Sequence, residues 1–211
     1  MTHSEESGAA EVEASRPRLL VIGGPTGSGK SWLMAKIASL DPSLHIVVTS
    51  TTRQPRAGEK HGVHYFFETP QTLGAAMARG ELAAYTKRGE NEYAVDLSRL
   101  SMEGTNVTIL DGPGIDEIAA APGIDSRFIG LGDTSLAAQR LRDRAADTAE
   151  SESIIEERLA NLDADAALIE TAVRQAGGVV LPSSQDALGA ILAGTIDCFG
   201  VCRDAVVDGV Q

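Results

Sequence analysis

The sequence predicts an α/β protein: a parallel five-stranded sheet flanked by helices, with an inserted mixed α/β lobe and a helical lid. Five short apolar runs have the length of buried strands, at residues 19–22, 46–48, 107–110, 128–131 and 179–181. Amphipathic stretches of helix length occur between and after them, at residues 31–40, 135–144, 153–175 and 185–196. Alternating strands and helices are typical of a parallel sheet, because parallel strands need crossover connections.

Residues 50–100 interrupt this order of strands and helices, because Gly and Pro residues separate short segments there. Residues 63–67 form a run in which apolar and polar side chains alternate. We therefore expect one folded domain over residues 17–200, in which residues 50–100 form an inserted lobe and residues 140–155 a lid. Residues 1–16 are acidic and rich in Ala, Ser and Glu, which predicts a disordered tail. Residues 201–211 are expected to form a C-terminal tail.

Composition excludes several classes of partner. The chain has 211 residues, with 18 basic and 30 acidic side chains and a net charge of -12, which opposes general attraction to nucleic acids or anionic lipids. No apolar run approaches the roughly 20 residues that cross a bilayer, and the N-terminus has no apolar signal segment. We expect a cytoplasmic monomer or homodimer, without nucleic-acid or membrane partners, whose two cysteines, Cys198 and Cys202, are reduced thiols.

A phosphate-binding loop follows the first predicted strand. Residues 24–31 read GPTGSGKS and fit the pattern G-x-x-x-x-G-K-[ST] between a strand and a helix. The glycines let backbone N–H groups turn inward around phosphate oxygens, and the helix N-terminus adds partial positive charge. A glycine turn that merely joined strand to helix would have no use for the Lys-Ser pair.

The loop motif assigns roles to individual side chains. Lys30 can reach the β- and γ-phosphates of ATP, and the Ser31 hydroxyl is placed to ligate Mg²⁺. Asp111, at the end of the 107–110 run, is a second predicted Mg²⁺ ligand through water, or else a turn aspartate. Trp32 is expected to pack beneath the first helix. The predicted ATP-binding residues are Gly24, Pro25, Thr26, Gly27, Ser28, Gly29, Lys30, Ser31 and Trp32.

A second candidate phosphate site follows the second strand. Residues 49–59 read TSTTRQPRAGE, and residues 62–67 read GVHYFF. Two arginines that bracket a proline, Arg53 and Arg56, can present rigid guanidinium forks to one phosphate, with Thr and Tyr hydroxyls as neutral donors. The alternative is a solvated basic turn.

These motifs resemble those of the guanylate kinase family, and the resemblance runs from residue 19 to about residue 196. It implies an ATP- and Mg²⁺-dependent nucleoside monophosphate kinase with a small phosphate-bearing acceptor. The family holds the acceptor phosphate with a hydroxyl residue, two arginines and two tyrosines. These roles carry over to Thr49, which replaces a serine, and to Arg53, Arg56, Tyr65 and Tyr93.

The resemblance also implies a lid whose arginines close over the transferring phosphoryl group. The similar segment reads QRLRDR at residues 139–144, followed by Arg158 in the next helix. The expected catalytic residues are Lys30, Arg140, Arg144 and Arg158. Alternatively, the arginines of residues 140–144 form an ordinary charged helix end.

The chain departs from the family at the positions that read guanine. The family uses a glutamate, a serine and an aspartate there, whereas spacing from Tyr65, Tyr93 and Asp111 places Ala84, Val95 and Pro113. Ala84, Val95 and Asp111 complete the predicted acceptor site. A site without polar readers loses selection for guanine, because such selection depends on pairing buried polar groups. We hypothesise an acceptor other than plain GMP, such as an altered nucleotide or a sugar phosphate.

Other interpretations remain open at this stage. A shift of a few residues in the spacing would let Glu81, Glu90 or Glu92 read the base, in an ordinary guanylate kinase. A relative of this fold, ribose 1,5-bisphosphate phosphokinase, reads no base, although it usually lacks the Arg-Gln-Pro-Arg loop. Guanylate kinase-like domains that act as binding modules typically lose the loop lysine. The family's adenine-side asparagine is not evident near residues 181–184, so donor preference is open.

Overall fold

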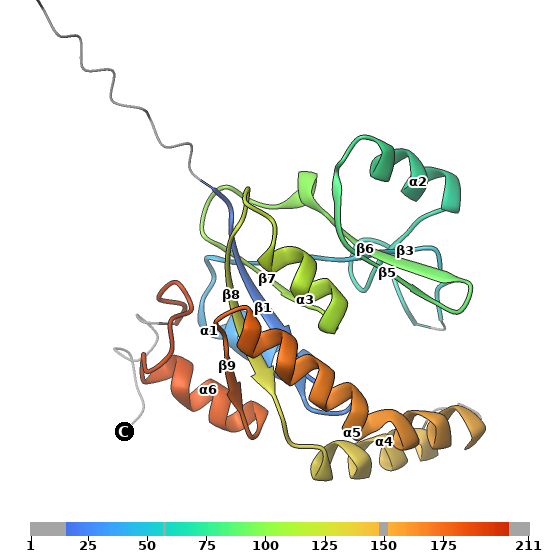
Figure 1. Ribbon diagram of the computed structural model, residues 1–211, viewed down its shortest axis with the longest axis vertical. Coiled ribbons are helices and arrows are strands. Elements are labelled where there is room, and N and C mark those ends of the chain that lie inside the picture. Colours follow the sequence, from blue (N-terminus) through green and yellow to red (C-terminus); the bar gives the residue numbers. More distant parts are fainter. Residues whose placement is uncertain (1–15, 57, 148–151, 203–211) are drawn as a thin grey trace, which may run out of the picture.

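The computed structural model describes residues 16–202 apart from residue 57 and residues 148–151. Its main sheet is parallel and five-stranded, as the sequence predicts, and the strand order is β2-β7-β1-β8-β9 (Figure 1). The strands are β1 (Arg18–Gly23), β2 (Leu44–Ile46), β7 (Thr105–Ile109), β8 (Asp125–Leu131) and β9 (Val179–Leu181). The second strand runs from Leu44 to Ile46, whereas the sequence predicts residues 46–48. One residue beyond its end, Val47 N still donates to Val107 O of β7 (2.9 Å).

Helices cover both faces of this sheet because its central strand is apolar on both sides. Leu20 and Ile22 of β1 pack into a cluster with residues of α1 (Lys30–Leu40) and α6 (Ser184–Leu192). Leu19 and Val21 point the other way, into a cluster with residues of α3 (Gly112–Ala119) and α5 (Glu152–Gln175). This alternation follows from the two-residue period of a strand.

Helix α3 is absent from the sequence prediction. Its first turn reads Gly-Pro-Gly, which is typical of a loop. Asp111 caps the helix, with its Oδ1 accepting from Gly114 N (3.1 Å), and Pro113 suits the first turn because its missing N–H needs no partner there. Ile115 and Ile118, three residues apart, are fully buried and hold the helix on the sheet.

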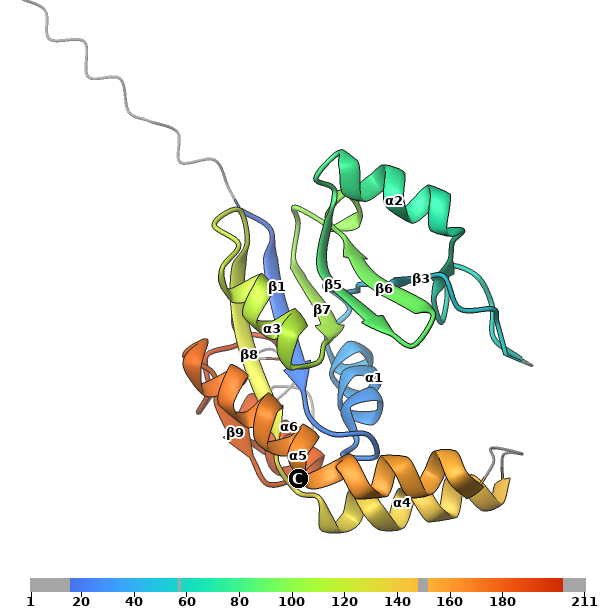
Figure 2. The ribbon, with the colours of Figure 1, turned by 45° about the vertical axis from the view of Figure 1, so that its right-hand side comes forward.

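The inserted lobe is a mixed sheet with strand order β4-β3-β6-β5, beside the helix α2 (Figures 1 and 2). The alternating run at residues 63–67 forms a strand only at its end, and Val63 is 63% exposed. The lobe comprises β3 (Ser50–Thr51), β4 (Phe66–Phe67), α2 (Pro70–Ala78), β5 (Leu82–Arg88), β6 (Asn91–Asp96) and the 3-10 helix η1 (Leu97–Arg99).

The predicted lid region forms two helices, α4 (Ser135–Asp147) and the start of α5, which lie side by side away from the lobe (Figure 2). Ala137 and Leu141 of α4 pack on Leu162 of α5. No helix within the described residues is both long and apolar enough to span a bilayer.

The predicted terminal tails lie mostly outside the described residues, which exclude residues 1–15 and 203–211. Val201 and Cys202, the first two residues of the expected C-terminal tail, are buried in the same cluster as Leu33 and Ile37 of α1. Cys198 and Cys202 are both buried, and neither forms a disulfide within the described residues. Burial raises the pKa of Cys202 to about 11, which keeps this thiol protonated and unreactive.

Candidate phosphotransfer site

The GPTGSGKS segment forms a tight loop between β1 and α1, and its glycines are sterically required. Gly27 and Gly29 have φ angles of 86° and 95°, in the left-handed region that favours glycine. A Cβ at Gly27 would lie 2.6 Å from the backbone oxygen of Ala137, and one at Gly29 would lie 2.7 Å from Ser184 Oγ. The starts of α4 and α6 therefore hold the loop in place from outside.

Lys30 lies along this loop. Its Nζ donates to the backbone oxygens of Gly24 (2.7 Å) and Pro25 (2.8 Å), so the ammonium group stays at the loop. Ser28 Oγ is buried and makes no hydrogen bond to any described residue, as expected of a group whose partner is a ligand oxygen. The glycine cradle, the lysine and this hydroxyl fit the phosphates of a nucleotide.

The two predicted Mg²⁺ ligands border the loop. Ser31 is exposed in the first turn of α1, and Asp111 follows Leu110, whose N donates to Ile22 O (3.3 Å) on the neighbouring strand. Asp111 is also the N-cap of α3, so its carboxylate has a structural role at the start of this helix. Its role toward a metal stays a prediction. Within the described residues no cluster of three or more His, Cys, Asp or Glu side chains could hold a metal. A Mg²⁺ ion here would depend on phosphate oxygens, as is usual for this ion.

The predicted acceptor loop holds Arg53 in a defined orientation. Arg53 Nη2 donates to both carboxylate oxygens of Glu59 (2.9 and 3.0 Å), and Nη1 donates to Gln54 O (2.8 Å). The guanidinium carbon lies 5.3 Å from the ring centre of Tyr65 and 5.8 Å from that of Phe67. The hydrogen bond from Arg53, then that from Arg56 N, holds the pKa of Glu59 below its usual value.

The two predicted tyrosines meet beside Arg53. The Tyr65 and Tyr93 rings pack edge to face, with centroids 6.1 Å apart. Burial, followed by the neighbouring Tyr93, raises the pKa of Tyr65, so its hydroxyl stays protonated and can donate to an anion. Thr49 joins the group through its backbone oxygen, which accepts from Phe66 N (2.9 Å). The structure thus gathers Thr49, Arg53, Tyr65 and Tyr93, and Arg56 lies exposed on the same loop.

Glu59 is a site residue that the sequence interpretation missed. A glutamate six residues after Arg53, at the end of an otherwise basic loop, is the signal that could have identified it. It binds the Arg53 guanidinium and accepts from the backbone N of Arg56 (2.7 Å), so it orients the Arg53 side chain and holds the backbone of the loop at Arg56. We interpret Glu59 as a positioning residue.

A pH experiment tests this ion pair. Since the pKa of Glu59 is lowered in the folded protein, the pair stabilises the fold fully above the unfolded pKa of about 4.3, and this contribution is lost as the pH falls through the folded pKa. We expect wild type to unfold at a higher temperature than Glu59→Gln, by a constant margin from about pH 5.5 to 8 that shrinks toward about pH 3. Thermal unfolding across this range measures the margin, and an unchanged margin at the lowest pH would contradict the assignment.

Two of the residues at the expected base-reading positions, Ala84 and Val95, do not line an open site. Ala84 and Val95 are 2% and 0% exposed and belong to the core cluster with Ile115 of α3. Ala84 has a φ of 52° at an irregularity in β5, next to Tyr85, whose N donates to Glu117 Oε2 of α3 (3.0 Å). The two side chains therefore join the lobe to the core, and they offer an acceptor no polar group.

The other candidate base-reading residues are Pro113 and the alternative glutamates, and each lies in a different environment. Pro113 is exposed in the first turn of α3. Glu81, one of the alternative readers, pairs with Arg79 at the lobe surface (2.6 Å). Glu92 lies on β6, where its N donates to Thr52 Oγ1 (2.9 Å).

The structure describes the side chains of two of the three expected catalytic arginines of the lid. Arg140 Nη1 donates to Gly27 O (3.2 Å), so this side chain lies on the phosphate loop. Arg158 lies half-buried on α5, and the side chain of Arg144 is outside the described residues. Their catalytic roles stay predictions.

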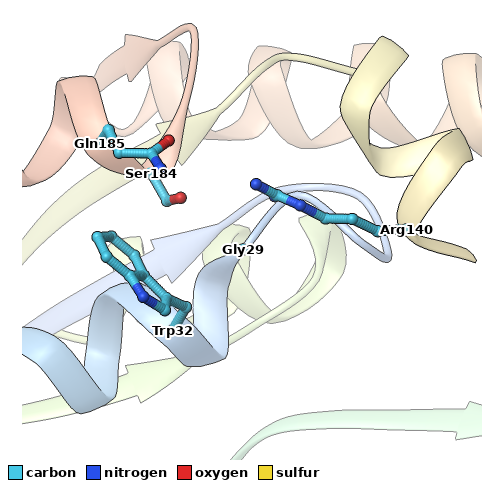
Figure 3. A pocket seen from close by; sticks show the side chains of 5 residues that line it. All are labelled: Gly29, Trp32, Arg140, Ser184 and Gln185. Atoms are coloured by element: carbon cyan, nitrogen blue, oxygen red, sulfur yellow. The ribbon is translucent and has the colours of Figure 1, made fainter. Parts of the chain in front are cut away.

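Trp32 corrects another expectation, because it is 44% exposed and does not pack beneath α1. The buried face of α1 is formed by Leu33 and Ile37, four residues apart, so their neighbour Trp32 points outward. Its indole borders a hollow of about 210 Å³ beside the loop (Figure 3). The lining residues are Gly29, Trp32, Arg140, Ser184 and Gln185.

A glycine cradle with an adjoining lysine on a parallel sheet, and a separate arginine-tyrosine site on an inserted lobe, define a P-loop protein of the kinase type. The family model for guanylate kinase matches residues 16–170. The chain belongs to the guanylate kinase family.

Individual relatives agree with this assignment. The chain is 31% identical over 174 residues to a guanylate kinase of Synechococcus sp., covering 74% of this chain and 93% of the relative. A guanylate kinase of Streptomyces coelicolor is 43% identical over 79 residues, covering 37% of this chain and only 40% of that protein. The crystal structure of guanylate kinase from Anaplasma phagocytophilum has the same fold, with a TM-score of 0.53 at 18% identity, covering 91% of this chain and 94% of that one.

Proposed function

We propose that the protein transfers the γ-phosphoryl group of Mg-ATP to the phosphate of a nucleoside monophosphate. The observation that carries this proposal is that two loops of different design, each with a basic side chain held in place, lie on separate elements. The P-loop with Lys30 suits a triphosphate, and the loop with Arg53, held by Glu59 beside Tyr65 and Tyr93, suits the single phosphate of an acceptor. The names of the relatives support the same activity.

The chemistry needs no covalent enzyme intermediate. An oxygen of the acceptor phosphate forms a bond to the γ-phosphorus of ATP, while the bond from that phosphorus to the β–γ bridging oxygen breaks and ADP leaves. Lys30 counters the charge on the transferring group, and Arg53 and Arg56 align the acceptor for in-line attack. Mg²⁺, held by Ser31 and by Asp111 through water, would neutralise the donor phosphates.

The acceptor base is recognised weakly in this proposal. Guanine presents N1–H and N2–H₂ donors, which require buried acceptors for selective binding. Ala84 and Val95 supply none and are buried against α3, and Pro113 supplies no side-chain acceptor. We therefore expect the enzyme to bind its acceptor mainly through the phosphate, without a strong preference for GMP over related nucleotides.

A coupled ADP-release assay with Mg-ATP tests the activity against GMP, dGMP, other nucleoside monophosphates and ribose 1,5-bisphosphate. We expect turnover of several monophosphates, with acceptor specificity constants within about 10-fold of each other, because no polar side chain at these three positions separates them.

Each other outcome contradicts a different part of the proposal. Strong turnover of GMP and dGMP alone would mean that guanine is read by other side chains, such as Glu90 or Glu92. Turnover of ribose 1,5-bisphosphate alone would indicate a sugar-phosphate kinase. Silence on every acceptor would favour a guanylate kinase-like binding module, despite the retained Lys30.

A further inference from the structure

We propose that Glu117 of α3 is a positioning residue that holds the inserted lobe against the main domain, and so fixes the acceptor site before a substrate binds. This inference rests on the proposed function, because it concerns the acceptor of that reaction. Glu117 acts at the contact between α3 and β5, and its effect passes through β5 to the acceptor loop.

Glu117 bonds the backbone of the lobe. Strand β5 loses its register with β6 between Ala83 and Thr86, and a backbone N–H at such an irregularity lacks its partner in the sheet. The N–H of Tyr85 donates instead to Glu117 Oε2 (3.0 Å), on a helix of the main domain (Figure 1). A carboxylate is a strong acceptor for a backbone N–H, because its charge strengthens the hydrogen bond. Glu117 therefore ties β5 of the lobe to α3.

The backbone of β5 adopts an unusual conformation at this contact. Ala84 has a φ of 52°, in the left-handed region, which is unfavourable for alanine and persists only where the surroundings enforce it. The Ala84 side chain is buried in one cluster with Ile115 and Ile118 of α3. The first turn of α3 is close as well, since a Cβ at Gly114 would lie 3.2 Å from Ala84 Cβ. Packing on α3 and the adjacent bond from Tyr85 together hold this conformation.

Helix α3 and strand β5 also connect the two sides of the reaction. Asp111, the predicted Mg²⁺ ligand, caps α3. Thr86, one residue after Tyr85, pairs with Tyr93 on β6, and the Tyr93 ring packs on Tyr65 of the acceptor loop. A shift of β5 along α3 would therefore move the acceptor tyrosines relative to the metal side of the site. Transfer between bound groups is sensitive to small misplacements, so this contact bears on the reaction.

Replacing Glu117 by Ala is expected to raise the KM for GMP by about 5-fold or more and to leave kcat at saturating GMP within about 2-fold of wild type. Without the bond a smaller fraction of molecules has a docked lobe, and the apparent affinity falls with that fraction. Bound acceptor favours the docked state, so kcat is retained. Glu117→Gln keeps a side-chain oxygen that can accept from Tyr85 N and should restore both constants to within about 2-fold of wild type. The coupled ADP-release assay at saturating Mg-ATP measures them.

Amide hydrogen exchange followed by NMR reports on the docking without any substrate. In the substrate-free wild type we expect the Tyr85 N–H to exchange at least about 100-fold more slowly than an unprotected amide, because exchange requires the bond to open. Glu117→Ala should lose most of this protection, and Glu117→Gln should keep it. The matched control is Asp116→Ala, which removes the neighbouring exposed carboxylate of α3 and should change neither the exchange nor the KM. Thermal unfolding checks that every variant is folded.

The outcomes separate this inference from the proposed function. Rapid exchange of the Tyr85 N–H in the wild type would overturn the positioning role and leave the phosphotransfer proposal standing. An unchanged KM for GMP in a folded Glu117→Ala protein, or a loss shared equally by kcat and by Mg-ADP affinity in calorimetry, would do the same. If the wild type turns over no nucleoside monophosphate, the proposed function is wrong, while the exchange of Tyr85 still decides whether Glu117 docks the lobe.

Discussion

Replacing Lys30 by Ala is expected to lower kcat by about 10²–10³-fold, which is the usual loss when one preorganised charge or donor is removed from a transferring group. The ammonium group is held at the loop by Gly24 O and Pro25 O, so it is in place before the reaction begins. Such a group contributes most when charge develops on the γ-phosphoryl oxygens, and therefore kcat should fall more than the affinity for ATP. The coupled ADP-release assay at saturating acceptor measures the change.

The matched control for this variant is Lys36→Ala, which removes an exposed lysine from the same helix. It should leave kcat within about 2-fold of wild type, since an exposed charge away from the site is screened. Thermal unfolding of both variants shows whether the loss in Lys30→Ala comes from chemistry or from a destabilised loop. Near wild-type turnover in a folded Lys30→Ala protein would contradict the role assigned to this lysine.

Replacing Arg53 by Ala is expected to reduce kcat/KM for the acceptor by roughly 10- to 100-fold, because a hydrogen bond to a charged group is worth about 1.5–3 kcal/mol. The two hydrogen bonds from Nη2 to Glu59, and the neighbouring Tyr65 and Phe67 rings, restrict the guanidinium to one orientation. Arg53→Lys keeps the charge without the planar fork, so it should recover only part of the loss. Steady-state kinetics with varied acceptor at saturating ATP gives these ratios.

Arg79→Ala is the matched control, because Arg79 also pairs with a glutamate of the lobe but is 58% exposed. We expect it to change acceptor kcat/KM by less than about 2-fold, as is usual for an exposed ion pair. Binding of Mg-ADP should be unaffected in both variants, since the donor site lies on other elements. An equal loss of ADP affinity in Arg53→Ala would show that this arginine acts through the fold and not on the acceptor.

The sequence by itself determined the parts of this protein that depend on local pattern. Each of the five apolar runs overlaps one of the five parallel strands, although the run at residues 46–48 shares only Ile46 with β2, and the GPTGSGKS motif forms a loop whose glycines have left-handed φ angles. The four predicted helices exist for the same reason, because apolar periodicity is a property of neighbouring residues. Arg53 and Tyr65, twelve residues apart, also lie together, since both border the short strands that close the acceptor loop.

Only the tertiary structure decided which side chains share a space. Helix α3 has a loop-like first turn and becomes a helix through the Asp111 cap and the burial of Ile115 and Ile118. Ala84 and Val95 are core residues because α3 packs on β5, which no local spacing reveals. Arg140 and Trp32 meet Ser184 beside the P-loop although they come from three helices far apart in the chain. Periodicity gives the face of an element, whereas the groups opposite that face depend on how distant elements pack.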